Sequence, residues 1–128
     1  MVDTLKYAEW FKHGDTDYKS ANILWEHDGD NSVICFLLQQ AVEKYLKGYL
    51  IKNSGLLQQG HNTRKLCNIA KTYNSEIGKY EKDCAFLNDF YIETRYPAED
   101  PLIISKDDVS ECFIIADKII DCVKKAIQ

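Results

Sequence analysis

Apolar residues recur every three or four positions through most of this sequence, and this helical spacing is the feature that most limits the possible folds. In the stretch 3–27 they form one stripe on an α-helix. The stripe consists of Tyr7, Phe11, Gly14, Tyr18, Ala21 and Trp25. A glycine inside a helix costs about 1 kcal/mol relative to alanine, so Gly14 predicts a close crossing with another helix. The chain has only two prolines and no useful stretch that alternates as a strand would.

The stretch 32–52 is the most apolar part of the chain and is expected to form the central helix. It follows a turn in which Asn31 or Ser32 can cap the helix. Its apolar residues cover well over half of the helix circumference, so this helix needs neighbours on more than one side. These residues are Ile34, Leu37, Leu38, Ala41, Val42, Tyr45, Leu46, Tyr49 and Leu50.

The remaining narrow arc of this helix is polar but carries two large apolar residues. Its members are Gln40, Glu43, Lys44 and Lys47, together with Phe36 and Ile51. Apolar residues on a polar face indicate a surface for a partner. A loop that covers Phe36 and Ile51 would explain the pattern equally well. Ile114 stands alone in the same way on the polar side of the last helix.

Further helices are expected after a loop that follows the central helix. A short helix is expected over residues 62–73, and a longer one over 77–94. The segment 96–101, which contains both prolines, ends the longer helix. The last helix begins at Ser105, which forms a capping box with Asp108.

Length and composition fit one domain. With 128 residues the chain is expected to be all-α: a single-domain up-and-down helical bundle of about five helices over residues 1–128. Its apolar runs are far shorter than the ~20 residues of a membrane span, and its N-terminus lacks signal-peptide features. The five cysteines include no C-x-x-C pair, which argues against a zinc site or a disulfide framework. We expect a cytoplasmic protein with no membrane contact, no metal and no cofactor.

The charge is unevenly distributed along the chain. The net charge is −4, yet residues 43–82 hold eight lysines and arginines against three glutamates, and both flanking segments are acidic. Lysines that gather near helix C-termini would explain the basic segment. The alternative is a patch that faces a phosphate or an acidic partner. Because the chain as a whole is acidic, binding of nucleic acid is not expected.

No motif of an independent active site is present in the sequence. The chain lacks a glycine-rich phosphate loop, a G-x-S-x-G turn and an H-E-x-x-H helix. His13 and Asp17, four positions apart, are expected to form an exposed pair rather than a catalytic one. We therefore predict no catalytic residue and no metal ligand.

Three short motifs nevertheless resemble one known family. They are Gln39-Gln40-Ala41-Val42-Glu43-Lys44-Tyr45-Leu46-Lys47, Gly60-His61-Asn62 and Arg95-Tyr96-Pro97, supported by Asp17, Ala21 and Leu24. In this order they resemble the HEPN family (higher eukaryotes and prokaryotes nucleotide-binding). The resemblance implies a helical up-and-down bundle that usually forms a homodimer. It also implies a possible minimal nucleotidyltransferase partner, because relatives often work beside such an enzyme in toxin–antitoxin-like pairs.

Some members of that family are metal-independent ribonucleases with an R-x(4–6)-H motif, and this sequence departs from their pattern. After Arg95 the positions that would hold the histidine are Asp100, Pro101 and Leu102. An ionised aspartate is a poor general acid. The expected function is therefore a non-catalytic binding module for a nucleotide, a nucleotidyltransferase partner, or both. A ribonuclease of the HEPN type is the alternative.

The binding hypothesis assigns roles to particular residues. Lys44, Lys47, His61 and Arg95 would form an electropositive cleft, Tyr96 would stack on a base, and Gln40 and Glu43 would supply hydrogen bonds. Arginine can hold a phosphate with two hydrogen bonds, whereas lysine acts as a point charge. A simpler interpretation is an exposed Glu43–Lys47 ion pair and an Arg95 that pairs with a helix C-terminus. Phe36, Ile51 and Ile114 are the expected interface residues.

Overall fold

Six helices make up the regular structure in a computed structural model that describes residues 2–93, 97, 99 and 103–128. They are α1 (Tyr7–Glu26), α2 (Asn31–Ser54), α3 (Thr63–Lys71), α4 (Ser75–Gly78), α5 (Glu81–Glu93) and α6 (Lys106–Ala126). The described residues contain no strand, so the all-α prediction is confirmed. The helix expected over 77–94 is instead two helices, because the single turn α4, capped by the Asn74 side chain, ends at Gly78 before α5 begins.

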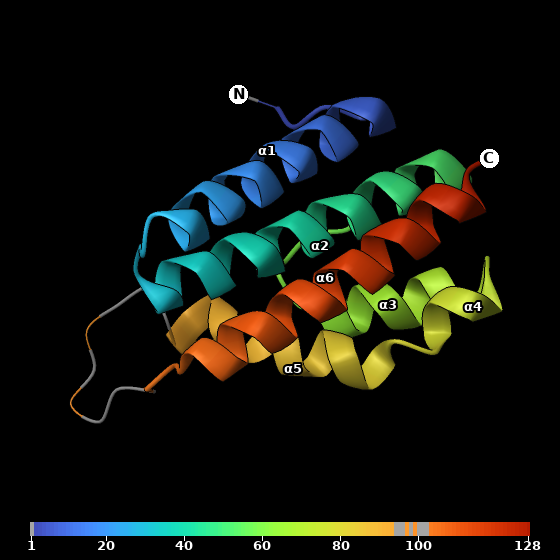
Figure 1. The fold of residues 1–128 in the computed structure, drawn as a ribbon. Coiled ribbons are helices and arrows are strands. Elements are labelled where there is room, and N and C mark those ends of the chain that lie inside the picture. The colour runs from blue at the N-terminus through green and yellow to red at the C-terminus, as the bar shows by residue number, and fades with distance from the viewer. Residues whose placement is uncertain (1, 94–96, 98, 100–102) are drawn as a thin grey trace.

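The helices are arranged around α2. It packs against α1, α3, α5 and α6. Figure 1 shows α1 on one side of the α2 and α6 layer and the three helices α3, α4 and α5 on the other. α2 runs antiparallel to α1, and α6 runs antiparallel to α5 (Figure 1), which is the up-and-down arrangement that the sequence predicted.

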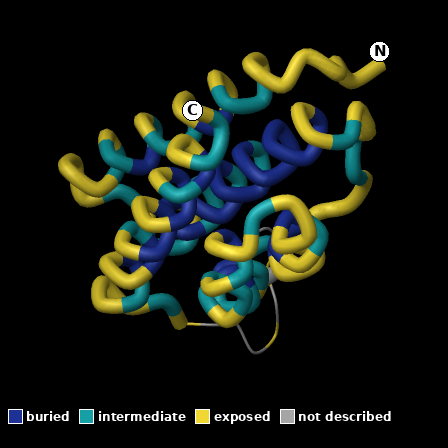
Figure 2. Tube along the Cα trace, turned by 90° about the vertical axis from the view of Figure 1, so that its right-hand side faces the viewer, coloured by how far each residue is buried: buried dark blue, intermediate teal, exposed yellow. Residues whose placement is uncertain are grey.

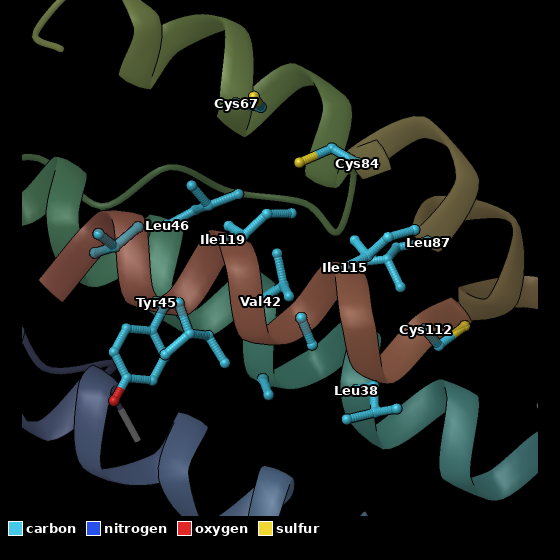
Figure 3. Close-up of a cluster of buried hydrophobic side chains, with 14 of the residues drawn as sticks. Leu38, Val42, Tyr45, Leu46, Cys67, Cys84, Leu87, Cys112, Ile115 and Ile119 are labelled. Carbon is cyan, nitrogen blue, oxygen red and sulfur yellow. The ribbon is translucent and has the colours of Figure 1, made fainter. Parts of the chain in front are cut away.

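The core lies along α2, as the apolar positions of that helix predicted. Figure 2 shows the buried residues gathered in the middle of the bundle, with the outer helix faces exposed. In Figure 3 the side chains of α2 meet those of α5 and α6. The residues that meet there include Leu38, Val42, Tyr45 and Leu46 of α2, Leu87 of α5, and Ile115 and Ile119 of α6, all of them at most 2% exposed.

Two glycines allow α1 and α2 to approach closely. A Cβ added to Gly14 of α1 would lie 2.7 Å from Cδ2 of Tyr45 and 3.2 Å from the carbonyl oxygen of Ala41. A Cβ added to Gly48 of α2 would lie 2.7 Å from Cε1 of Phe11. The close crossing predicted at Gly14 is therefore confirmed, and Gly48 provides its counterpart on the other helix.

The helix caps agree only partly with the sequence predictions. Asp30 caps α2, since its Oδ1 accepts hydrogen bonds from the backbone N–H groups of Ser32 (2.8 Å) and Val33 (3.3 Å). The expected cap at Asn31 or Ser32 is thus wrong by one or two positions. The capping box of Ser105 and Asp108 is confirmed, with hydrogen bonds of 3.0 and 3.1 Å. Within the described residues, no helix combines the length and hydropathy required to cross a membrane.

Candidate functional site

Three polar side chains of α2 are buried on one face of the helix. Gln39 is 0% exposed, Glu43 2% and Lys47 6%. Their spacing of four residues stacks them one turn apart. Charged side chains are almost never buried without a partner. The interpretation of Glu43 and Lys47 as a solvated surface pair is therefore wrong.

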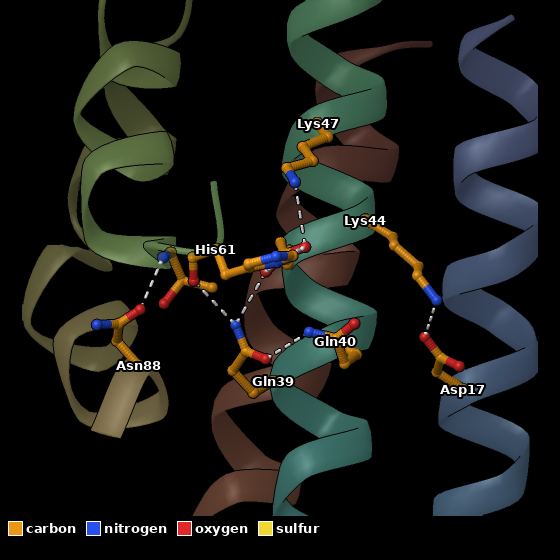
Figure 4. A network of polar contacts seen from close by, with 9 residues as sticks. Asp17, Gln39, Gln40, Lys44, Lys47, His61 and Asn88 are labelled. Carbon is orange, nitrogen blue, oxygen red and sulfur yellow. Dashed lines mark hydrogen bonds and ion pairs between the residues drawn. The ribbon is translucent and has the colours of Figure 1, made fainter. Parts of the chain in front are cut away.

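The Glu43 carboxylate is the centre of this cluster, because it contacts Gln39, Lys47 and His61. Figure 4 shows these three side chains pointing toward one another. One oxygen, Oε2, lies 3.2 Å from Nζ of Lys47. Nδ1 of His61 lies 3.1 Å from Oε1 and 3.2 Å from Oε2. Nε2 of Gln39 donates to Oε1 at 3.3 Å, and also to the backbone carbonyl of His61 at 3.3 Å. Glu43 thus joins α2 to the loop that precedes α3.

His61 is held on one side and open on the other. An ionised carboxylate can only accept hydrogen bonds, so this contact requires the tautomer of His61 in which Nδ1 carries the hydrogen and donates to Glu43. The imidazole stacks on the ring of Tyr91 of α5, with centroids 4.4 Å apart and planes at 17°. Its side chain is nevertheless 48% exposed. No described residue hydrogen-bonds to Nε2, so this nitrogen is available to a ligand.

The residues that follow His61 attach the loop to α5. The backbone N–H of Thr63 donates to Oδ1 of Asn88 at 3.1 Å, and its hydroxyl donates to the carbonyl of Cys84 at 2.7 Å. Asn62 caps α3 by accepting from the backbone N–H of Lys65 at 3.0 Å. His61 therefore occupies a fixed point where the loop, α2 and α5 meet.

The structure brings together only part of the predicted site. Glu43, Lys47 and His61 are in contact, whereas Nζ of Lys44 lies 2.6 Å from Asp17 of α1. That contact replaces the pair expected between His13 and Asp17. Gln40 reaches the cluster indirectly, through a 2.9 Å hydrogen bond from its Nε2 to Oε1 of Gln39.

The predicted electropositive cleft has fewer available cations than the sequence suggested. Lys44 and Lys47 are each engaged by a carboxylate of the same chain. Arg95 and Tyr96 lie outside the described residues. A positively charged site would therefore depend on His61 and Arg95. This part of the hypothesis stays a prediction.

Sequence reasoning missed four residues of the site: Gln39, Thr63, Asn88 and Tyr91. Gln39 and Thr63 stand inside or next to the motifs Gln39–Lys47 and Gly60–Asn62, so the motifs contained the signal. Asn88 and Tyr91 lie outside these motifs, and their roles at the site depend on how α5 packs against the loop. Among the described residues, no three His, Cys, Asp or Glu side chains are arranged to hold a metal ion.

The three expected interface residues have different surroundings. Ile51 is only 5% exposed within the single chain, so its assignment as a surface residue is wrong. The reason is that α2 packs against helices on several sides, so that tertiary packing also covers Ile51 on its polar arc. Phe36 is half-buried, with its ring centroid 5.9 Å from that of Tyr91. Ile114 on α6 is 47% exposed, as the sequence suggested.

The protein is a small all-helical domain with the Gln39–Glu43–His61 cluster at its site. Comparison with known families identifies the family of this domain. The family model of the HEPN domain matches residues 7–126. The chain therefore belongs to the HEPN family, as its motifs indicated.

Two solved structures resemble this one over nearly their whole length. The protein TT1696 from Thermus thermophilus is 24% identical, with a TM-score of 0.81 over 96% of this chain and 99% of that chain. ST0689, described as an archaeal HEPN homologue, is 25% identical, with a TM-score of 0.75 over 96% of this chain and 98% of that chain. No curated protein matches the chain significantly.

Proposed function

We propose that this HEPN domain is a non-catalytic binding module that holds a nucleotide beside His61 and works with a minimal nucleotidyltransferase. The observation that carries the proposal is the geometry of His61. Glu43 binds Nδ1 and Tyr91 supports the ring, while nearly half of the side chain remains exposed. An imidazole that is fixed before a ligand arrives loses little conformational entropy on binding.

The open nitrogen of His61 suits the polar groups of a nucleotide. When the ring is protonated, Nε2 donates a hydrogen bond, as a phosphate requires; when it is neutral, Nε2 accepts one, as from a ribose hydroxyl. Arg95 would add a bidentate phosphate contact, and Tyr96 would supply an aromatic face for the base. Lys47 and Lys44 act in this proposal by balancing Glu43 and Asp17 rather than by contacting the ligand.

An exposed apolar area supports a protein partner. Ile114 of α6 and Trp25 of α1 are 47% and 37% exposed. Together with Phe113 they line a hollow of about 320 Å³, whose rim also includes Tyr18, Asn22, Ser110 and Asp117. Exposed apolar groups that lie together favour a protein contact. We propose this area, in place of Ile51, as the contact for the nucleotidyltransferase or for a second copy of the chain.

Calorimetric titration with ATP, GTP and AMP tests the nucleotide part. We expect micromolar binding of at least one nucleotide, weakened about tenfold or more in His61→Ala because a hydrogen bond to a charged group is lost. His27→Ala is the matched control, since His27 is an exposed histidine at the end of α1 with no side-chain contact to the cluster. Absence of binding by all three nucleotides in the folded protein would contradict the proposal.

Two further assays test the other parts of the proposal. Co-purification with the nucleotidyltransferase of a neighbouring gene, lost in Ile114→Glu, would support the partner; retention of the complex in that variant would refute the proposed contact. Incubation with RNA in EDTA tests the ribonuclease alternative. Cleavage that disappears in Arg95→Ala would show that the domain is catalytic after all.

A further inference from the structure

A hollow lies between the N-terminal segment and the first turns of α1. Its volume is about 450 Å³, and Val2, Thr4, Trp10 and Lys44 form part of its wall. The indole Nε1 of Trp10 donates to the carbonyl oxygen of Thr4 at 2.9 Å, and the backbone N–H of Lys6 donates to the Thr4 hydroxyl at 3.0 Å. The bond from Trp10 holds the segment against α1, and the bond from Lys6 forms a turn within the segment. A hollow of this size is in the range of small-molecule sites.

The side chains around this hollow carry an excess of negative charge. Asp3 and Glu9 line it, and the carboxylate of neither pairs with any other described residue. The positive charge of Lys44 is already matched by Asp17, 2.6 Å away. A ligand with a positive charge would therefore gain attraction here, whereas an anion would be repelled.

The indole ring of Trp10 adds a second feature that favours a cation. Tryptophan has the strongest cation–π attraction of the aromatic side chains. Nζ of Lys47 already lies 5.8 Å from the ring centroid, and its charge is balanced by the Glu43 carboxylate 3.2 Å away. It also provides a flat apolar surface within the hollow, next to Val2. Organic ammonium groups are commonly recognised by such a combination of aromatic and acidic side chains.

We propose that this hollow binds a small organic cation, an ammonium group attached to an apolar or aromatic body. The apolar part packs on Trp10 and Val2, and the positive group lies near Asp3 and Glu9. This site is separate from the contacts of His61 and takes a ligand of opposite charge to a nucleotide.

Fluorescence of Trp10 gives a direct test. The chain has two tryptophans, so Trp25→Phe leaves Trp10 as the single reporter. We titrate this variant with benzyltrimethylammonium, and with benzyl alcohol and benzenesulfonate as neutral and anionic probes. The experiment is run at about pH 8, above the usual titration range of histidine, because His13 also lines the hollow. We expect a saturable change with the cation and a much weaker one with the other two probes.

The acidic residues are tested by a double variant in the same background. Asp3→Asn with Glu9→Gln should weaken binding of the cation about fivefold or more. Glu26→Gln, at the far end of α1, is the matched control and should leave the affinity for the cation unchanged. If Trp25→Phe does not fold, calorimetry on the chain with both tryptophans measures the same difference between the double variant and its control. Equal binding of the three probes, no saturation, or an unchanged affinity in the double variant would overturn the proposal. ATP binding unaffected by benzyltrimethylammonium would show that the two sites are distinct.

Discussion

The Glu43 carboxylate lies within 3.2 Å of Nδ1 of His61 through both of its oxygens, although the two residues are 18 positions apart in the chain. Glu43 is buried, whereas the His61 side chain is 48% exposed. The contact therefore connects the interior of the bundle to its surface at the loop before α3. The same carboxylate balances Lys47, so a change at Glu43 should affect both stability and binding.

Removal of the Glu43 charge should destabilise the fold strongly. Glu43→Gln leaves Lys47, which is 6% exposed, without its counter-ion. We expect the free energy of unfolding to fall by about 3 kcal/mol, as for other buried pairs that lose one partner. Urea denaturation measures the change. The double variant Glu43→Gln with Lys47→Met should lose less free energy of unfolding than the two single variants added together. Strictly additive losses would show that the pair is not coupled.

An exposed ion pair provides the control for that prediction. Glu76 and Lys79 lie 2.5 Å apart, with both side chains more than 60% exposed. Glu76→Gln should leave the free energy of unfolding almost unchanged in the same urea denaturation, because water screens such pairs. A loss as large as that of Glu43→Gln would mean that burial is not the cause.

Gly14→Ala should weaken the α1–α2 contact. The added Cβ would lie 2.7 Å from the ring of the buried Tyr45, so one of the two helices must move. Overpacking of this kind costs about 1–3 kcal/mol, more than the gain in helix propensity. Thermal denaturation followed by circular dichroism measures the loss. Lys19→Ala, an exposed substitution on the same helix, should be nearly neutral. A stabilised Gly14→Ala variant would contradict the close crossing.

The capping box of α6 should contribute measurably to stability. Ser105→Ala removes the hydrogen bond to the backbone N–H of Asp108, and we expect a loss of about 1 kcal/mol. Ser110→Ala, at an exposed position within the same helix, should show no comparable loss. Equal effects of the two substitutions in urea denaturation would argue that Ser105 does not act as a cap.

Three tyrosines should titrate late in the folded protein. Burial, followed by the hydrogen bond to Asp117, raises the pKa of Tyr18 from 10.0 to about 12. Burial is also the largest cause of the raised pKa of Tyr45, which bonds to Asp15, and of the raised pKa of Tyr49. Absorbance titration of the phenolate should show that these groups ionise above the pH at which an unfolded chain does.

The sign of the effect on stability follows from these directions. The unfolded state releases the tyrosine protons near pH 10.0, while Tyr18 in the folded state holds its proton to about pH 12. The unfolded state therefore binds fewer protons, and the free energy of unfolding decreases as pH rises through this window. Tyr45→Phe should make the decrease less steep in urea titrations at high pH. An unchanged slope would show that Tyr45 titrates normally.

Several local features could be predicted because they depend only on neighbouring residues. The stripe on α1, the glycine at position 14 and the Ser105 cap are examples, since helix periodicity and capping act within a few positions. The break between α4 and α5 was missed, because Ile77, Tyr80, Cys84, Leu87 and Tyr91 keep the spacing of a helix across it. Motif resemblance added His61 and Glu43, but it did not indicate that they are in contact.

By itself, the sequence determined the helical class, the central position of α2 and the membership of the HEPN family. The tertiary structure alone decided that Glu43 and Lys47 on the polar arc of α2 are buried, that Glu43 joins His61 to Lys47, and that Ile51 is inside. The physical reason is that periodicity describes one helix at a time. Whether an arc meets water depends on every element packed around it, and α2 is in contact with four other helices.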